Sequence, residues 1–324
     1  MPNIATHGLL AQDVLDKAPF KSLAKIISQY PKAYFLGSNG PDFLFYYRAL
    51  PWQTLKGINR MVAIGNRVHA QKIDDFYRVA IDVIKATQDI HLRNAMISFL
   101  AGHLTHWSLD TIAHPYIFYK TGPIAGSTKY WHSRFESNID TLMVKQIKGF
   151  SLTKFDIPQL VDADALTKKA VAMLYPAILK DIFDETVSRH EIIECIESFH
   201  TVIKLLNDPL TLKFPLVQFF ESLAGIRWSN SCHMVTGILD TKNDILNLNH
   251  RVWMHPSDEA QKSQDSFLDL YEYARIRALG MLCAFNDVMF KDAMPDQLIG
   301  LIGDRTYDTG MKNPPDMIHF DPIY

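Results

Sequence analysis

The segment that decides the fold is residues 101–119, which read AGHLTHWSLDTIAHPYIFY. Within this largely apolar run, His106, Asp110 and His114 are spaced by four residues. In an α-helix each four-residue step rotates a side chain by only about 40°, so the three groups share one face and span about 12 Å. The spacing therefore predicts a helix that carries an imidazole–carboxylate–imidazole stripe in an otherwise apolar environment.

This stripe is typical of a metal site. Imidazole and carboxylate ligands suit divalent cations such as Zn²⁺. The stripe is too long for one ion, so it would serve two, with Asp110 as the bridge. The competing interpretation is a polar helix face in which each His–Asp pair contributes a few tenths of a kcal/mol. Burying three ionisable groups without a partner costs several kcal/mol, and this cost favours metal binding.

The next segment repeats the spacing. Residues 130–140 read YWHSRFESNID, in which His132 and Glu136 are again four apart. A short connection brings successive helices antiparallel, so His114, His132 and Glu136 can close one site. Two histidines and a glutamate with an open fourth position form a pattern found in catalytic zinc sites.

Histidine is concentrated around these two helices. The chain has 13 histidines, and four of them fall within residues 103–132. Three residues elsewhere are further candidate ligands, although each is a weak signal alone. They are His7 in ATHGLL, just before the first predicted helix, Asp42 in the turn GPD, and His69 in GNRVHAQ.

The rest of the chain also has helical periodicity, and we expect an all-α protein. Residues 57–86 are predicted as one long helix, and Pro115 is predicted to end a helix that begins at residue 91. No pair of segments has hairpin signals, and the tail 304–324 is expected as an extended surface arm. Further helices are predicted at 129–147, 163–174, 178–187, 190–206, 213–225, 229–239, 257–291 and 294–302.

Composition limits the class of protein. With 324 residues, 48% hydrophobic and 21% charged, the chain is globular. We expect a metal-bearing helical half, 1–150, and a second helical half, 151–324, packed as one continuous domain. The net charge of −2 makes nucleic acid an unlikely partner. The three cysteines form neither a disulfide framework nor a thiolate metal site. No signal peptide or transmembrane segment is visible, so a cytoplasmic location is expected.

The order of candidate ligands, with the opening THGLLAQDVL and the GPD turn, resembles the bacterial zinc-dependent phospholipase C family. That family is related to the N-terminal domain of glycosylphosphatidylinositol-specific phospholipase D, and fungal single-strand-specific nucleases share its fold. The resemblance implies an all-α bundle with a metal cleft and two to three zinc ions. The implied sites are Asp42, His69, His106 and Asp110; then His114, His132 and Glu136; and then His7 with Asp110 and the N-terminal amino group.

One residue of the stripe region has no settled role in this pattern. His103 lies three residues before His106. It can act as an outer partner that donates to a ligand carboxylate, or it can replace His106 as the ligand.

The resemblance implies phosphodiester hydrolysis, in which a metal-activated water attacks phosphorus. Asp110 would bridge two ions, and Asp42 would orient the water or act as general base. The expected partner is a phospholipid or another small phosphodiester, with peripheral membrane contact. Two alternatives stay open: a nuclease-like or nucleotide phosphodiesterase on the same fold, and a metal-bearing scaffold without turnover. Residues 151–324 would supply a partner surface or a substrate pocket.

Overall fold

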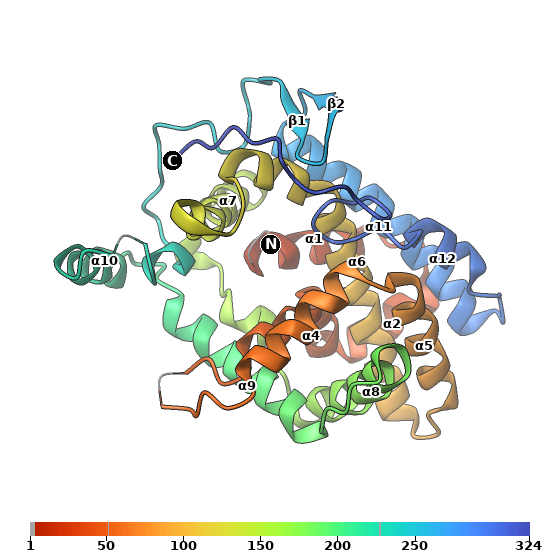
Figure 1. Ribbon diagram of the computed structural model, residues 1–324. Coiled ribbons are helices and arrows are strands. Elements are labelled where there is room, and N and C mark those ends of the chain that lie inside the picture. The colour runs from red at the N-terminus through yellow and green to blue at the C-terminus, as the bar shows by residue number, and fades with distance from the viewer. Residues whose placement is uncertain (1–3, 51, 227) are drawn as a thin grey trace.

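The computed structural model describes residues 4–50, 52–226 and 228–324, and helices dominate it (Figure 1). The all-α class expected from the sequence is confirmed. The α-helices are α1 (Ile4–Asp16), α2 (Lys21–Gln29), α3 (Pro31–Gly37), α4 (Ile58–Ala70), α5 (Ile73–Ala86), α6 (Ile90–Thr121), α7 (Trp131–Lys148), α8 (Ala165–Phe183), α9 (Arg189–Leu206), α10 (Lys213–Leu223), α11 (Phe267–Phe290) and α12 (Asp296–Ile302). Short 3₁₀ helices lie between them: η1 (Gly40–Tyr46), η2 (Gly126–Thr128), η3 (Leu152–Lys154), η4 (Pro158–Val161) and η5 (Ser231–His233).

Helix α6 runs through the interior and carries the polar stripe. Nearly all of its residues from Ala95 onward are buried, and it packs against α3, α8 and α11 (Figure 1). Its first turn is capped by Asp89, whose carboxylate accepts the backbone N–H groups of His91 and Leu92. The stripe therefore lies where polar groups require partners.

Two glycines let α3 and α6 cross closely. A Cβ atom on Gly37 would lie 2.0 Å from the carbonyl oxygen of Phe99, and one on Gly102 would lie 2.0 Å from that of Tyr34. Neither point has room for a side chain larger than hydrogen. Because η1 follows α3 directly, this crossing brings η1 and its Asp42 against α6.

Helix α6 continues past Pro115 to Thr121, so the predicted end at this proline is wrong. Pro115 has no N–H to offer the carbonyl of Thr111, four residues earlier. That carbonyl instead faces Gly310 of the C-terminal segment, where a Cβ atom would lie only 2.1 Å from the oxygen. Packing against other elements keeps the helix intact through the proline.

Other predicted boundaries also change. Helix α8 continues through Pro176 and unites the two helices predicted at 163–174 and 178–187. The predicted helix 57–86 is two helices, because Lys72 adopts φ 55° and turns the chain between α4 and α5. The predicted helix 229–239 contains only η5.

One hairpin is present where the sequence has no hairpin signal. Strands β1 (Trp253–His255) and β2 (Asp258–Ser263) pair antiparallel, with Trp253 opposite Ser263. The predicted helix 257–291 therefore begins later. Ser266 and Asp269 form a capping box that starts α11 after the hairpin.

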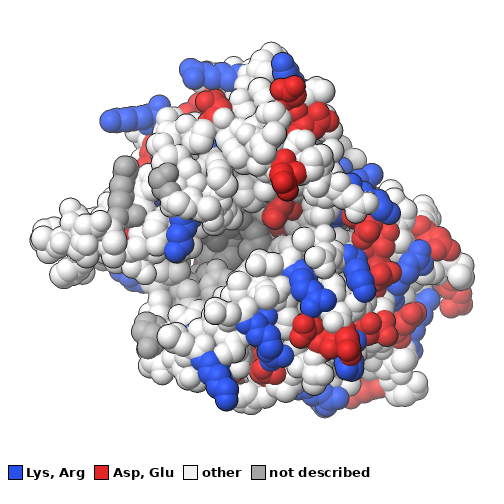
Figure 2. All heavy atoms as spheres, viewed as in Figure 1, with Lys and Arg blue, Asp and Glu red and all other residues white. Residues whose placement is uncertain are grey.

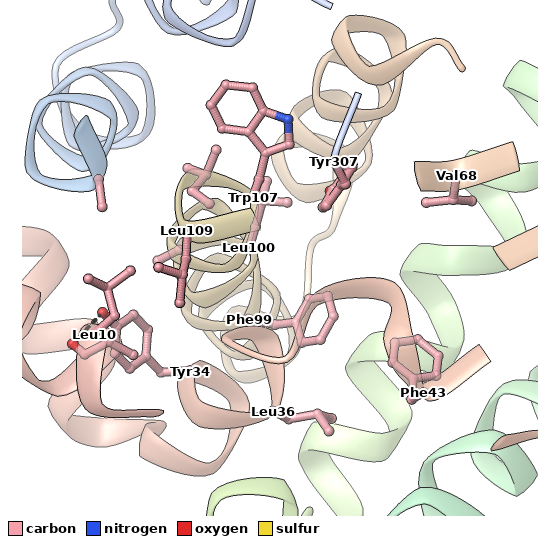
Figure 3. Close-up of a cluster of buried hydrophobic side chains, with 14 of the residues drawn as sticks. Leu10, Tyr34, Leu36, Phe43, Val68, Phe99, Leu100, Trp107, Leu109 and Tyr307 are labelled. Carbon is pink, nitrogen blue, oxygen red and sulfur yellow. Dashed lines mark hydrogen bonds between the residues drawn. The ribbon is translucent and has the colours of Figure 1, made fainter. Parts of the chain in front are cut away.

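Side chains from distant parts of the chain share one buried hydrophobic cluster (Figure 3). Leu10, Phe99 and Trp107 contribute to it together with Tyr307 from the tail. The tail has no helix or strand after α12, but it is not confined to the surface as expected. Tyr307 is only 1% exposed, and the indole N–H of Trp107 donates to the carbonyl of Arg305. Within the described ranges, no helix is long and apolar enough to cross a membrane.

Candidate metal centre

The eight side chains singled out as ligands meet in three neighbouring groups beside α6. All eight are buried. Within each group, one ligand atom from every residue lies within 4.8 Å of the others. The groups are His7, His106 and Asp110; Asp42, His69 and His106; and His114, His132 and Glu136.

The carboxylate of Asp110 lies between these groups. Its Oδ2 is 3.0 Å from Nε2 of His106, and its Oδ1 is 3.2 Å from Nε2 of His7 and 3.7 Å from Nε2 of His114. Desolvation alone would raise the pKa of Asp110, but the three imidazoles outweigh it and hold that pKa well below its usual range. An anion at this point is well placed to bridge two cations.

Asp42 reaches the second group from η1. Its Oδ1 is 3.1 Å from Nε2 of His69 and 3.6 Å from Nε2 of His106. Gly40 has φ 48°, and a Cβ atom there would lie 2.0 Å from the His106 ring, so glycine lets the turn approach. Nδ1 of His69 is 2.7 Å from the carbonyl oxygen of Gly65, which leaves Nε2 directed at Asp42. Burial lowers the pKa of His69, but the Asp42 carboxylate more than compensates and the pKa is raised.

Helices α6 and α7 supply the third group. Nε2 of His132 is 3.0 Å from Oε1 of Glu136, and Nε2 of His114 is 3.8 Å from the same oxygen. Nδ1 of His114 is 3.1 Å from the carbonyl oxygen of Tyr307, so an N–H at Nδ1 leaves Nε2 available for a metal. Burial lowers the pKa of His114 to about 3 and that of His132 well below its usual value. Both imidazoles are therefore neutral at pH 7, the state in which imidazole binds a metal.

The imidazole nitrogens and carboxylate oxygens of the candidate ligands are arranged better for binding a metal ion than for hydrogen bonding to one another. Both ring nitrogens of His7 and His106, both carboxylate oxygens of Asp110 and Nε2 of His114 make no hydrogen bond of good geometry among the described residues, even though Asp110 lies 3.0 Å from His106 and 3.2 Å from His7. Each buried polar atom left in this way costs about 1–3 kcal/mol. Cations between the groups would satisfy these atoms, and imidazole nitrogen with carboxylate oxygen is a donor set that Zn²⁺ accepts.

His103 lies outside the three groups. Its Nδ1 is 2.9 Å from the hydroxyl oxygen of Tyr77, its Nε2 is 3.2 Å from that of Tyr175, and its ring stacks on Phe76. Burial lowers the pKa of His103 well below its usual value. Two phenols therefore occupy both of its nitrogens, while His106 joins two of the candidate groups.

Sequence reasoning missed Asp140, which anchors the start of α1 against α7. Its carboxylate accepts the N–H of Ala5 at 2.9 Å, the N–H of Thr6 at 2.8 Å and the hydroxyl of Thr6 at 2.6 Å. His7 lies inside α1 rather than before the first helix, so this anchor helps to position its ring. The signal was present, because Asp140 follows Glu136 by four residues. The N-terminal amino group that the resemblance adds lies outside the described residues.

Sequence reasoning also missed the C-terminal segment 304–311. The N–H of Tyr307 donates to the carbonyl of His69 at 3.0 Å, while its own carbonyl oxygen faces His114. Oδ1 of Asp308 is 3.6 Å from Nδ1 of His114, and Asp308 lines the adjacent pocket. Sequence spacing does not link these residues to the ligand helices, so only the folded chain reveals them.

A pocket of about 880 Å³ opens over the second and third groups. Figure 2 shows this face of the molecule hollowed near its centre. Asp42, His114 and Glu136 lie on its polar side, and Phe199 and Ile203 of α9 belong to its apolar wall. Among the described residues, neither lysine nor arginine lines it. The pocket thus combines an anionic, imidazole-rich floor with a surface suited to an apolar group.

The fold and these groups define a class: an all-α protein with a buried candidate site for several divalent metal ions. The family model described as zinc dependent phospholipase C matches residues 6–204, and the chain belongs to that family. The resemblance based on the order of candidate ligands is thereby confirmed. No curated protein and no solved structure gave a significant match. The matched range contains all eight candidate ligands and ends about a hundred residues before the segment that holds Tyr307.

Proposed function

We propose that the protein is a zinc-dependent phosphodiester hydrolase of the phospholipase C type, with two or three zinc ions. The observation that carries this proposal is a set of buried imidazole nitrogens and carboxylate oxygens that make no well-formed hydrogen bonds and lie next to a partly apolar pocket. In this assignment Asp42, His69, His106 and Asp110 hold one ion, His114, His132 and Glu136 hold a second, and His7 with Asp110 holds a third.

Zinc at this centre supplies Lewis acidity, which neutralises charge on phosphoryl oxygens and makes a water molecule more acidic. The protein supplies the positioning. Asp110, held anionic by three imidazoles, lies within reach of His7, His106 and His114, so its two oxygens can serve neighbouring sites. Asp42 lies on the pocket wall, where its carboxylate can orient the attacking water and accept its proton.

The reaction balances as a hydrolysis. The water oxygen bonds to phosphorus and the bond from phosphorus to the glycerol oxygen breaks. Asp42 takes the water proton and releases it to solvent, and the leaving alkoxide on the opposite side takes a proton from solvent. The products are diacylglycerol and a phosphorylated head group. We assign the group of His114, His132 and Glu136 to the side of the leaving oxygen. Along the stripe, Asp42 lies beside His106, four residues before Asp110, and Glu136 lies beside His114, four residues after it.

The pocket favours a phospholipid over a nucleic-acid strand. A polyanionic strand is normally held by lysine and arginine along its backbone, and the described lining residues include none. The apolar side chains of α9 instead suit the glycerol backbone and the first carbons of an acyl chain.

Metal content and substrate range test the proposal together. Purified protein should contain two to three zinc ions per chain by mass spectrometry, and it should release p-nitrophenol from p-nitrophenylphosphocholine. Bis-p-nitrophenyl phosphate and a dinucleotide serve as competing substrates. Absence of zinc would overturn the metal assignment. Zinc without hydrolysis would indicate a scaffold, and faster cleavage of the dinucleotide would indicate the nuclease-like alternative.

A further inference from the structure

Helix α10 presents apolar side chains to solvent instead of to the core. Five apolar residues share one face of this helix. Counted from Leu212, at the N-terminal boundary, the others follow after four, seven, eight and eleven residues; they are Leu216, Phe219, Phe220 and Leu223. All five are exposed, with Leu212 at 72% and Leu223 at 70%. A soluble helix normally turns such a face inward, so this outward orientation requires an explanation. We call these five residues the α10 apolar face.

The orientation of α10 is fixed by polar contacts on its inner side. The carboxylate of Glu221 is buried and accepts the N–H groups of Asn230 at 2.6 Å and Ser231 at 2.9 Å. At the start of the helix, the carboxylate of Asp208 accepts the N–H groups of Lys213 at 2.9 Å and Phe214 at 2.7 Å. These bonds join the start of α10 to the preceding turn and Glu221 to the start of η5, which packs against α7. The apolar face therefore points outward as part of the fold.

The α10 apolar face carries no charge. The acidic group of the helix, Glu221, is turned inward, and the ammonium of Lys213 donates to the carbonyls of Leu205 and Asn207, at 2.9 Å each. In Figures 1 and 2, the projecting lobe at the left that contains α10 is white at its tip, without Lys, Arg, Asp or Glu. An uncharged apolar surface matches a zwitterionic lipid layer better than an anionic one.

The segments on both sides of α10 line the pocket. Leu205 and Leu206 precede the helix, and Asn230 and His233 follow it, and all four belong to the pocket wall. A layer seated on the α10 apolar face would therefore lie next to the pocket mouth.

Exposed apolar side chains continue around the same opening. Ile124, itself a pocket residue, is 56% exposed, and Leu205 is 51% exposed. Trp52 and Leu55 are also exposed, in the loop that follows pocket residue Leu50. Exposed apolar side chains that gather in this way mark an interaction site. Apolar side chains near a pocket opening suit contact with a lipid layer, from which a single lipid molecule can enter the pocket.

We propose that the α10 apolar face inserts into the surface of a zwitterionic phospholipid layer and seats the pocket mouth against it. The delivery of substrate in this scheme rests on the proposed function, whereas the binding of lipid surfaces does not. Insertion of this kind is driven by burial of apolar area and so depends little on salt.

The test compares two double variants on phosphatidylcholine vesicles. Phe219→Ser with Phe220→Ser removes two exposed rings that contact each other. Ile276→Ser with Met294→Ser is the matched control, because both residues are exposed apolar side chains outside α10 and the pocket lining. Zinc content and circular dichroism should be unchanged in both variants.

We expect the wild type and the control to cosediment with the vesicles at low and high salt, and the α10 variant to bind at least tenfold more weakly. Hydrolysis of soluble p-nitrophenylphosphocholine should be the same in all three proteins, while hydrolysis of vesicle lipid should fall at least tenfold in the α10 variant alone.

The outcomes separate the two proposals. The lipid-surface proposal is overturned if the wild-type protein does not bind the vesicles, or if the α10 variant binds them as well as wild type, even when soluble substrate is hydrolysed. Concentration-dependent dimerisation that the α10 variant abolishes would identify the face as a contact between two copies instead, which also overturns it. Vesicle binding without any hydrolysis would overturn only the proposed function.

Discussion

Nδ1 of His114 lies 3.1 Å from the carbonyl oxygen of Tyr307, a residue 193 positions further along the chain. This contact fixes the ring orientation of one candidate ligand through a backbone atom that lies beyond the family-matched residues 6–204. Outer partners of this kind set the tautomer of a metal-binding histidine and hold its other nitrogen toward the metal. The C-terminal segment 304–311 therefore helps to orient a candidate metal ligand.

The packing of that segment on α6 can be tested at Gly310. Gly310 has φ 63°, and a Cβ atom there would lie 2.1 Å from the Thr111 carbonyl oxygen. Gly310→Ala should push the segment away from α6 and move the Tyr307 carbonyl away from His114. We expect zinc affinity to fall about 10–100-fold, the usual effect of losing such a partner. Competition with a chelator measures it.

Gly303→Ala is the matched control for this prediction. Gly303 has the same φ of 63°, but its Cβ atom would meet nothing closer than 3.6 Å. Both variants carry the cost of a left-handed alanine, about 1–2 kcal/mol, so both should lower the melting temperature. Only Gly310→Ala should weaken zinc binding. Equal zinc affinities in the two variants would show that the segment does not position the site.

Asp110 should be the most sensitive of the candidate ligands, because its oxygens lie within 3.7 Å of His7, His106 and His114. Asp110→Asn keeps the shape but removes the negative charge and one ligand oxygen. We expect lower zinc content and a loss of phosphodiester hydrolysis of at least about 1000-fold, equivalent to about 4 kcal/mol in the barrier. Asp82→Asn, an exposed change on α5, is the control. Normal zinc content and turnover in Asp110→Asn would refute the bridging role.

The two neighbouring histidines of α6 should respond differently to the same substitution. His106→Gln removes a residue that belongs to two of the candidate groups, so zinc should be lost. His103→Gln should retain zinc but lower the stability of the protein by about 1–3 kcal/mol, because the buried hydroxyls of Tyr77 and Tyr175 lose well-placed partners. Metal analysis and urea unfolding of both variants measure these effects. Zinc loss in His103→Gln would instead make His103 a ligand or an essential outer partner.

Local spacing was enough to predict the helix-borne part of the candidate site. His106, Asp110 and His114, and likewise His132 and Glu136, share a face because helix geometry alone places them there. His7, Asp42 and His69 come from separate elements, and spacing alone made each a weak candidate. Their grouping was expected only from the order of ligands in a related family, and the fold then brings them together.

The remaining features of the fold depend on tertiary contacts, which the hydrophobic periodicity of the sequence does not encode. The sequence predicts a helix end at Pro115, but the Thr111 carbonyl that this proline leaves without an N–H donor lies against Gly310. The helix predicted at 213–225 matches α10, yet its pattern predicts an inward apolar face. The buried carboxylates of Asp208 and Glu221 hold that face outward, and a pattern of hydrophobic residues does not include such bonds.

Asp140 gives a prediction about pH. Burial raises the pKa of this carboxyl to about 7, although three hydrogen bonds from Ala5 and Thr6 favour the anion. An unfolded chain would ionise Asp140 near pH 3.8. Between these two values the folded state binds more protons than the unfolded state, so this group's contribution to stability decreases as the pH rises from about 4 to about 7.

Asp140→Asn isolates this contribution, because asparagine keeps one acceptor oxygen but does not ionise. The variant should be less stable than wild type near pH 4.5, where it lacks one acceptor and the wild-type carboxyl is largely protonated. That deficit should shrink toward pH 8, because only the wild type then carries the cost of a buried anion, about 1.4 kcal/mol for each unit of pKa shift. Urea unfolding in excess chelator measures the difference, with the exposed change Asp82→Asn as the control that should show no such trend. A deficit that stays constant or grows with pH would mean that the three hydrogen bonds keep Asp140 ionised in the folded protein.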